Sequence, residues 1–451
     1  MTTPTAGGTG NDDHVDEMRD ADAVRRQVRA WIDRYFDRDI TLRAWLERLA
    51  DSGWAKPTWP VAWFGKGLPT DLAAVAYAEL AKVGAPGPPA GLGAMLAAPT
   101  IIAHASEALK RRLVRAVLVG DHAWCQLFSE PGAGSDLAGL QTRADRDGDD
   151  FVVNGQKVWT SGAQVADFGM LLTRTDPDAP KHRGITYFAL EMQQPGIEVR
   201  PLRQITGEAS FAEVFLTDAR VPARNVIGDV NQGWKVAVAT LGYERLGLGA
   251  GSGIDARVPA PGGSRVRAQL ELSVGDFITA SRTRRTWTGT GGAAMIGRGI
   301  APLIELAKRL GRDRDPAVRQ QLVRLHTLGR LNAWNGLRGR ASVQAGGKAG
   351  GEMSIGKLMV SHIARQWRDT ASEISGAHAM LAGSDGLLDG ALAVQLLATP
   401  GPAIYGGTDQ IQRTIIGERV LGLPAERDLS KEVPFRQLKV GTQSRQQNEA
   451  S

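Results

Sequence analysis

The chain has 451 residues, of which 42% are hydrophobic and 23% charged, so it is long enough for several packed domains and too apolar to be disordered throughout. Its formal net charge of +6 is small for this length and argues against a polyanion such as nucleic acid as the main partner. The single cysteine, Cys125, excludes an intrachain disulfide. The Thr/Gly/Asp-rich start lacks a signal-peptide pattern, and no apolar run is long enough for a membrane span. We therefore expect a cytoplasmic protein without a membrane span.

The first part of the chain is predicted to be helical. Residues 1–13 are expected to be disordered and residues 14–120 to form an N-terminal helical domain. Apolar residues recur at three- and four-residue spacing in Val24–Ile32 and Leu72–Leu80, as in amphipathic helices. Two prolines interrupt the pattern between Trp54 and Phe64, so an aromatic turn is expected there.

A β domain is predicted over residues 121–233, where short runs rich in Val, Phe, Thr and Tyr alternate with turn residues. Strands are readable at Phe168 to Arg174, Gly184 to Gln193 and Phe211 to Val221. The pair Asn154-Gly155 predicts a hairpin turn.

Helical periodicity returns from Trp234, and residues 234–427 are predicted to form a C-terminal helical domain. Residues 251–300 are rich in Gly, Pro, Ser and Arg and are expected to be an inserted irregular segment, with a short helix at most near Gln269–Thr279. The basic run Ser281–Trp287 could contact nucleic acid or a membrane surface, but a solvated loop is the preferred interpretation. Residues 428–451 are expected to be a loosely ordered polar tail.

Three motifs follow one another along the chain. They are Ser129-Glu-Pro-Gly-Ala-Gly-Ser-Asp136, Gly155-Gln-Lys-Val-Trp-Thr-Ser161 and Ile404-Tyr-Gly-Gly-Thr-Asp-Gln-Ile-Gln-Arg413. Glycines in the first and third allow backbone N–H groups to approach a ligand closely, and the tryptophan of the second offers a flat apolar surface. Taken singly, each has an ordinary structural alternative: a Gly/Pro turn, a core tryptophan, or a Gly turn before a helix N-cap.

With these motifs in this order, and with helices on both sides of a β domain, the chain resembles the acyl-CoA dehydrogenase family over nearly its whole length. The resemblance implies an α+β multidomain fold with an N-terminal all-α domain, a middle β-barrel or sandwich and a C-terminal four-helix-bundle-like domain. It also implies FAD as cofactor, acyl-CoA as substrate and an electron-transferring flavoprotein as partner. The expected assembly is a homo-oligomer, a dimer or homotetramer, active in fatty acid or lipid metabolism such as β-oxidation.

The resemblance assigns site residues to positions in this chain. The residues it implies for FAD are Gln126, Phe128, Ser129, Trp159, Ser161, Arg309, Gly407, Thr408 and Gln410. Those it implies for the substrate are Ser135, Arg245, Tyr405 and Gly406. The family completes its FAD site with an arginine, here matched to Arg309, and a glycine-rich turn from a neighbouring chain; the turn reads Ser372–His378 here, which departs from the family pattern. No metal site is predicted, because the histidines show no ligand spacing.

The catalytic base is the most informative position. Removing a proton α to a thioester requires a carboxylate in a water-poor pocket. Most family members place this glutamate directly after the loop tyrosine, where this chain has Gly406. Isovaleryl- and long-chain-type members place it on the first helix after the β domain, before an arginine, and that position is Glu244. The alternative is a helix-surface carboxylate with a basic partner; Arg245 is not that partner, because adjacent helical residues diverge.

The sequence thus predicts an FAD-dependent α,β-dehydrogenation of an acyl-CoA to the 2,3-enoyl-CoA, with Glu244 as base and the Gly406 N–H polarising the thioester carbonyl. Two alternatives remain open. One is a non-catalytic subunit paired with an active paralogue in a hetero-oligomer, favoured by the altered Ser372–His378 turn and the 251–300 segment. The other is an oxygen-using flavoenzyme on the same fold.

Overall fold

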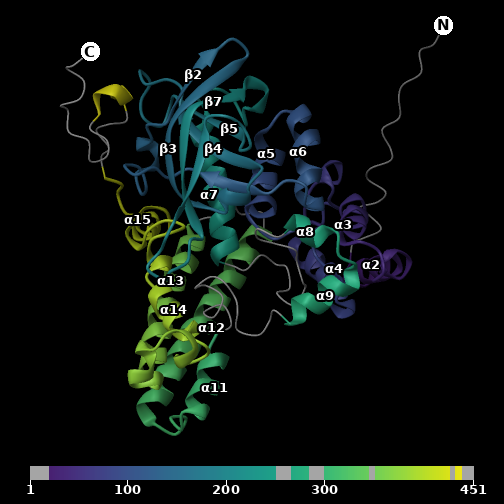
Figure 1. Cartoon of the computed structure of the whole chain (residues 1–451), viewed down its shortest axis with the longest axis vertical. Helices are drawn as coiled ribbons and strands as arrows, with labels where there is room; N and C mark the ends of the chain where they lie inside the picture. Colours follow the sequence, from purple (N-terminus) through teal and green to yellow (C-terminus); the bar gives the residue numbers. More distant parts are fainter. Residues whose placement is uncertain (1–19, 250–265, 284–298, 345–350, 427–431, 439–451) are drawn as a thin grey trace. The chain divides into compact units, whose positions relative to one another are not determined.

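A computed structural model describes residues 20–249, 266–283, 299–344, 351–426 and 432–438 (Figure 1). The chain divides into two compact units. The first unit comprises the residues up to Ala123 together with Ser252–Thr283, and the second comprises Trp124–Gly251 and Arg284–Ser451. The predicted disorder of residues 1–13 lies outside the described residues.

The first unit is helical, as predicted. Its helices are α2 (Ala21–Tyr35), α3 (Leu42–Asp51), α4 (Thr70–Val83), α5 (Ala98–His104), α6 (Glu107–Val119), α8 (Val266–Leu270) and α9 (Val274–Thr283), with a π-helical turn, Gly93–Ala97, before α5. Val24, Val28 and Ile32 lie one turn apart on α2 and are buried in the core. The predicted aromatic turn contains the short 3₁₀ helix Val61–Trp63.

Residues 266–283 differ from the irregular segment expected within the C-terminal helical domain. They form α8 and α9, and Leu270, Val274, Phe277 and Ile278 join the core of the first unit. The backbone N–H of Leu42 donates to the carbonyl of Leu272 at 2.8 Å. The spacing of the four apolar residues is helical, but the Gly-, Pro- and Arg-rich flanks conceal it in the sequence.

A mixed sheet forms the first half of the second unit. Its strands are β1 (Trp124–Leu127), β2 (Arg143–Asp147), β3 (Asp150–Ser161), β4 (Phe168–Arg174), β5 (Ile185–Glu191), β6 (Ile197–Leu202) and β7 (Phe211–Pro222). The strand order is β1-β4-β2-β3-β7-β6, and β5 pairs with β4. β4 and β5 are buried along almost their whole length, so the sheet encloses an apolar core.

The predicted hairpin at Asn154-Gly155 is wrong. Both residues lie inside β3, and the turn that joins β2 to β3 is at Asp147–Asp150. A register shift between Val153 and Gly155 marks a bulge opposite β7. A Cβ at Gly155 would lie 2.7 Å from the Cα of Thr142, so glycine is required by close packing and not by a turn.

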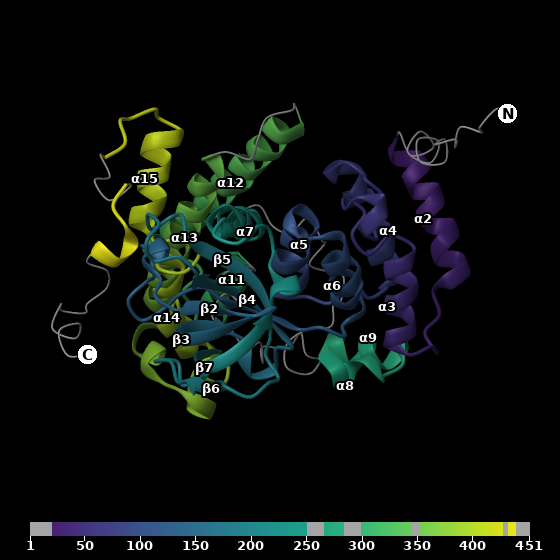
Figure 2. The ribbon, with the colours of Figure 1, turned by 90° about the horizontal axis from the view of Figure 1, so that it is seen from above.

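Helices form the rest of the second unit. They are α7 (Gly233–Gly249), α11 (Ala301–Arg309), α12 (Pro316–Gln344), α13 (Glu352–Ser375), α14 (Ala391–Ala398) and α15 (Asp409–Arg419). α13 packs against α7, α12 and α15, and its Trp367 is fully buried. α7 also contacts β5, as both Figure 1 and Figure 2 show. α13 therefore connects the bundle to the helix that lies on the sheet.

Two segments near the C-terminus depart from simple loops. After α13 the chain turns at Gly376, with a φ of 52°, into the 3₁₀ helix Gly376–Met380. In the predicted polar tail, residues 432–438 contain the 3₁₀ helix Phe435–Gln437. Phe435 is buried beneath the guanidinium of Arg174, whose Cζ lies 3.8 Å from the ring centre. This part of the tail is thus packed on the sheet.

Candidate functional site

Glu244 lies on α7, where that helix faces the first strand of the sheet. The side-chain amide of Gln126, on β1, donates to Oε2 of Glu244 at 3.5 Å. α7 is attached to the sheet one turn earlier, where the hydroxyls of Tyr187 and Thr240 are 3.3 Å apart. The fold therefore brings together two residues that are 118 positions apart in the chain.

The environment of Glu244 favours a proton acceptor. Burial raises the pKa of Glu244 above its ordinary value. The hydrogen bond from Gln126 and the positive charges of Arg245 and Lys357 oppose this rise, but burial outweighs them. A carboxylate with a raised pKa is a stronger base than a surface glutamate, as α-proton removal requires.

Arg245 is partly buried beside the base. Burial lowers the pKa of its guanidinium, the nearby charge of Arg419 lowers it further, and Glu244 opposes both. Arg419 belongs to α15, so α7 and α15 present two positive charges to the same region. Such a region is suited to an anionic or strongly polar part of a ligand.

The first motif is held to the second by a buried ion pair. Lys157 is fully buried, and its ammonium donates to Oε1 of Glu130 at 2.7 Å and to the carbonyl of Phe128 at 3.2 Å. The N–H of Val158 also donates to the carbonyl of Ser129 at 2.9 Å. These contacts fix Phe128 and Ser129 next to the strand that carries Trp159.

Glu130 has further donors that keep it charged. Its carboxylate accepts the backbone N–H groups of Gln141 and Thr142, at 2.6 and 3.0 Å. Burial alone would raise the pKa of Glu130, but Lys157 and these donors hold it below its ordinary value. The pair is therefore an internal anchor of the loop.

Trp159 is an exposed and strained residue. Its side chain is 59% exposed, and its φ of 60° is uncommon for a bulky residue. The ring meets Phe211 edge-on at 5.9 Å and leaves a flat indole surface open. Ser161, two residues further along β3, is also exposed. Strain at an exposed aromatic residue is typical of a ligand contact.

Replacing Trp159 with glycine should show whether this side chain contributes to ligand binding or to the stability of the fold. Glycine adopts a positive φ without the roughly 1 kcal/mol that an L side chain pays, so the thermal midpoint should stay constant or rise. The resemblance seen in the sequence implies a flavin against Trp159, so we expect the flavin affinity of the purified protein to fall about tenfold when this stacking surface is lost. Flavin absorbance against protein absorbance gives the measurement, and the exposed Trp334, changed to alanine, is the control. Unchanged flavin affinity in Trp159→Gly would remove Trp159 from the cofactor site.

The third motif forms the loop before α15. Gly406 and Gly407 have φ values of 65° and 87°, so the loop takes a backbone shape that favours glycine. The carbonyl of Gly406 accepts the side-chain amide of Gln412 at 3.0 Å. Thr408 caps α15 by accepting the N–H of Ile411 at 3.3 Å. Tyr405 and Gln410 are exposed on either side.

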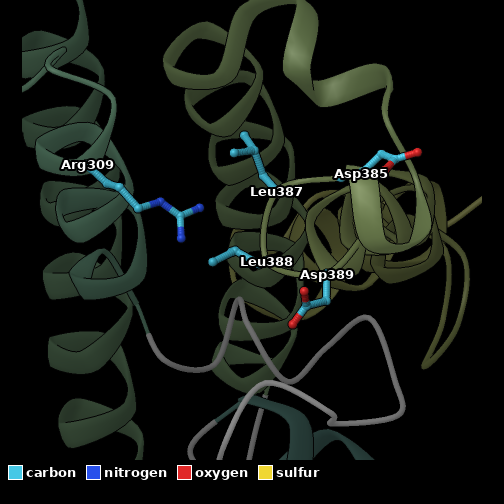
Figure 3. Close-up of a pocket in the computed structure, with 6 residues that line it drawn as sticks. Arg309, Asp385, Leu387, Leu388 and Asp389 are labelled. Carbon is cyan, nitrogen blue, oxygen red and sulfur yellow. The ribbon is translucent and has the colours of Figure 1, made fainter.

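Arg309 is not brought to the other predicted cofactor residues of the same chain. It ends α11, at the end of the bundle away from the sheet in Figure 1. There it lines a cavity of about 380 Å³ with residues 385–389. Figure 3 shows its guanidinium directed toward this loop, which also carries Asp385 and Asp389. The Asp389 carboxylate disfavours an anionic ligand beside Arg309 unless Arg309 offsets its charge.

One predicted position remains, and it is on the surface of the first motif. Ser135 is exposed, and its neighbour Asp136 accepts the ammonium of Lys181 at 3.2 Å. Within the described residues there is no cluster of His, Cys, Asp or Glu suited to a metal ion. Among the described helices, none is both long and apolar enough to cross a membrane.

The sequence interpretation missed the buried charges that support the site. Lys157 is separated from the buried Phe151 and Val153 by an even number of positions along β3. Alternation of side chains along the strand therefore predicts that Lys157 points to the same, buried face of the sheet. Lys357 on α13 is also buried and interacts electrostatically with Glu244. Its helical spacing with Ser361 and Arg365, every fourth residue, was a readable signal.

The residues present fit the ring of a flavin. Trp159 offers an open aromatic face, and the partly exposed Gln126 and Ser129 lie on the strand and loop tied to it. Gly406 and Gly407 allow close approach of the backbone at the start of α15. Asp409, in the first turn of α15, would oppose a phosphate, but Arg365 binds it through two nitrogens at 3.0 Å.

Comparison with known protein families gives three matches in chain order. The models described as acyl-CoA dehydrogenase N-terminal, middle and C-terminal domain match residues 14–121, 125–219 and 276–421. Acyl-CoA dehydrogenase IpdE1 of Mycobacterium tuberculosis is 34% identical over 432 residues, which cover 91% of this chain and 99% of that protein.

Solved structures show the same arrangement. A structure titled Tcur3481-Tcur3483 steroid ACAD is 25% identical, covers 91% of this chain and 100% of its own, and has a TM-score of 0.64. The ChsE4-ChsE5 complex from Mycobacterium tuberculosis is 28% identical, covers 90% of this chain and 98% of its own, and has a TM-score of 0.61. The predicted fold class is confirmed by these matches and by the helix-sheet-helix order.

Proposed function

Since this chain belongs to the acyl-CoA dehydrogenase family and is an oxidoreductase that acts on acyl-CoA, we propose that it performs α,β-dehydrogenation with Glu244 as the base. The product is the 2,3-enoyl-CoA. The hydrogen bond between Gln126 and Glu244 carries the proposal, because it joins the carboxylate of α7 to the strand that leads into the first motif. Burial of Glu244 supports the proposal as well, because it distinguishes this carboxylate from an exposed helix-surface glutamate.

Each residue has a defined part in the proposed reaction. Glu244 accepts the α-proton, and Gln126 holds its carboxylate in position. The N–H of Gly406 donates to the thioester carbonyl as negative charge develops there. Trp159 shields the reacting atoms from water. FAD, when bound, supplies the acceptor for the hydride that leaves the β-carbon. We propose an electron-transferring flavoprotein as the next electron acceptor.

The proposed substrate carries a bulky polycyclic acyl group. One similar solved structure is titled a steroid ACAD, and the catalytic glutamate on a helix leaves the loop at Gly406 without a side chain. The test compares anaerobic bleaching of the purified flavoprotein by a steroid side-chain CoA thioester, a branched-chain acyl-CoA and a long straight-chain acyl-CoA. Bleaching by the steroid thioester alone supports the proposal; faster bleaching by the straight chain contradicts it.

The pH dependence of bleaching tests the base directly. Only ionised Glu244 accepts a proton, so the rate should fall as the pH drops through its pKa. Because burial raises that pKa, the midpoint should lie above the range of an ordinary glutamate. Stopped-flow bleaching rates between acid and neutral pH give the profile. A midpoint at the ordinary glutamate value would argue that Glu244 is solvated and is not the base.

A second candidate function is that of one subunit in a paired assembly. The cavity beside Arg309 favours it, because Asp389 would oppose the pyrophosphate that a neighbouring identical chain would bring there. The similar ChsE4-ChsE5 structure is a complex of two different chains. Native mass spectrometry with flavin quantification distinguishes the two cases. One FAD per chain in a homo-oligomer would exclude the paired assembly, and fewer would support it.

A further inference from the structure

A ladder of polar side chains on α13 holds the loop that contains Gly406. Lys357 and Ser361 both donate to the carbonyl of Pro402, Ser361 at 2.8 Å. One turn further along, Arg365 donates to Asp409 at 3.0 Å. The ladder therefore makes hydrogen bonds to both ends of residues 402–409, a segment that contains Tyr405, Gly406 and Gly407.

Burying the ammonium of Lys357 costs free energy, because the group loses its hydration. Its side chain is 1% exposed, and removing an ammonium from water is unfavourable. Burial accordingly lowers the pKa of Lys357, as does Arg365, while the negative charges of Asp409 and Glu244 raise it. Ser361 shows that a neutral hydroxyl can also hold the Pro402 carbonyl. The position of the charge, between α7 and α15, is thus the distinctive property of Lys357.

Two charged groups and one neutral amide from three elements act on Glu244. Its own helix supplies Arg245, α13 supplies Lys357, and β1 supplies the neutral amide of Gln126. Arg245 is itself near Arg419 of α15. Lys357 also donates to the carbonyl of Pro402, in the loop that would hold the substrate carbonyl. Lys357 therefore combines a hydrogen bond to the loop with an electrostatic interaction with the base.

We propose that Lys357 is a positioning residue of the active site, which holds the Gly406 loop through Pro402 and keeps a positive charge close to the Glu244 carboxylate. This inference rests on the proposed function of Glu244. This charge opposes the rise in the pKa of Glu244 that burial causes, so it favours the ionised form of the base. The two tasks, loop anchoring and charge, are separable by substitution.

The experiment compares neutral and charged replacements in the holoenzyme. Lys357→Gln keeps a donor for Pro402 and removes the charge, Lys357→Arg keeps the charge, and Ser361→Ala removes the second donor with no change of charge. Without the charge the pKa of Glu244 should rise, so the acid midpoint of kcat/KM should move up by about one pH unit in Lys357→Gln. Lys357→Arg should restore the original midpoint. Ser361→Ala should lower kcat with no shift of the midpoint.

A measurement without turnover separates this inference from the proposed function. The infrared carbonyl stretch of protonated Glu244, identified by its absence in Glu244→Gln, is titrated in wild type and in Lys357→Gln. A shifted titration in a protein that does not bleach would support the electrostatic role and sink the dehydrogenase proposal. Equal titrations, or an equal shift in Ser361→Ala, would overturn the role of Lys357. If Lys357→Gln does not fold, Lys357→Met takes its place, because it fills the buried site with an apolar chain.

Discussion

Glu244→Gln is expected to abolish bleaching of the flavin by acyl-CoA while the protein keeps its yellow colour. The amide is nearly the same size and still meets Gln126, but it cannot accept the α-proton. A positioned base contributes about 10²–10⁴-fold to such a step, so the bleaching rate should fall by at least that range. Anaerobic stopped-flow absorbance measures the rate, and the resting flavin spectrum measures cofactor retention.

The control is Glu198→Gln, on the exposed strand β6, where the carboxylate pairs with Arg200 at the surface. It should bleach at the wild-type rate. Wild-type bleaching in Glu244→Gln would refute the assignment of the base. A wild-type protein that binds flavin but does not bleach with any acyl-CoA would favour the non-catalytic subunit. Rapid reoxidation by air in the presence of substrate would favour the oxygen-using flavoenzyme.

The second large effect is expected at the ion pair under the first motif. Lys157→Met would leave Glu130 buried without its cation, which typically costs about 3–5 kcal/mol. The free energy of unfolding of the second unit should fall by that amount, as measured by urea denaturation. Flavin retention should fall as well, because Lys157 also holds the carbonyl of Phe128.

A double variant tests whether the loss arises from the unpaired charge. In Lys157→Met/Glu130→Gln the amide side chain at position 130 would be neutral, and its single carbonyl oxygen would accept one of the two N–H groups of Gln141 and Thr142, so part of the stability should return. The ion pair between Lys181 and Asp136, whose carboxylate is exposed, offers a comparison: Lys181→Met should change stability by under about 1 kcal/mol. If Lys157→Met proves as mild as Lys181→Met, the buried pair does not anchor the loop.

Much of the fold was predictable because its signals are local. Helical spacing in Val24–Ile32 reflects one helix that buries one face, and the apolar run Phe168–Arg174 reflects one strand that is buried on both faces. The order of the three motifs indicated the family from side-chain identity alone, and the family models confirm it. Local sequence patterns predicted the wrong structure where tertiary packing determined the backbone conformation. Asn154-Gly155 reads as a turn, yet β7 and Thr142 hold it inside a strand.

The candidate catalytic residue was identified from the sequence, but the side chains that surround it were not. Glu244 follows from a glycine at position 406 and a glutamate before Arg245, and its catalytic role stays a prediction. The contact of Glu244 with Gln126, the rise of its pKa on burial, and the charge of Lys357 near it depend on residues more than 100 positions apart in the chain. Arg309 shows the converse, since the fold of one chain does not bring it to the other predicted FAD residues.

The sequence by itself determined the family, the order of the domains and the candidate base, because these depend on residue types and on spacing within single elements. Only the tertiary structure decided which charges are buried and which groups they face. Burial and Coulomb interactions depend on distance in space, and α7, α13 and β1 meet through packing that no local pattern records. Packing between distant segments also explains why α8 and α9 belong to the first unit, since the apolar residues of 266–283 are buried in its core.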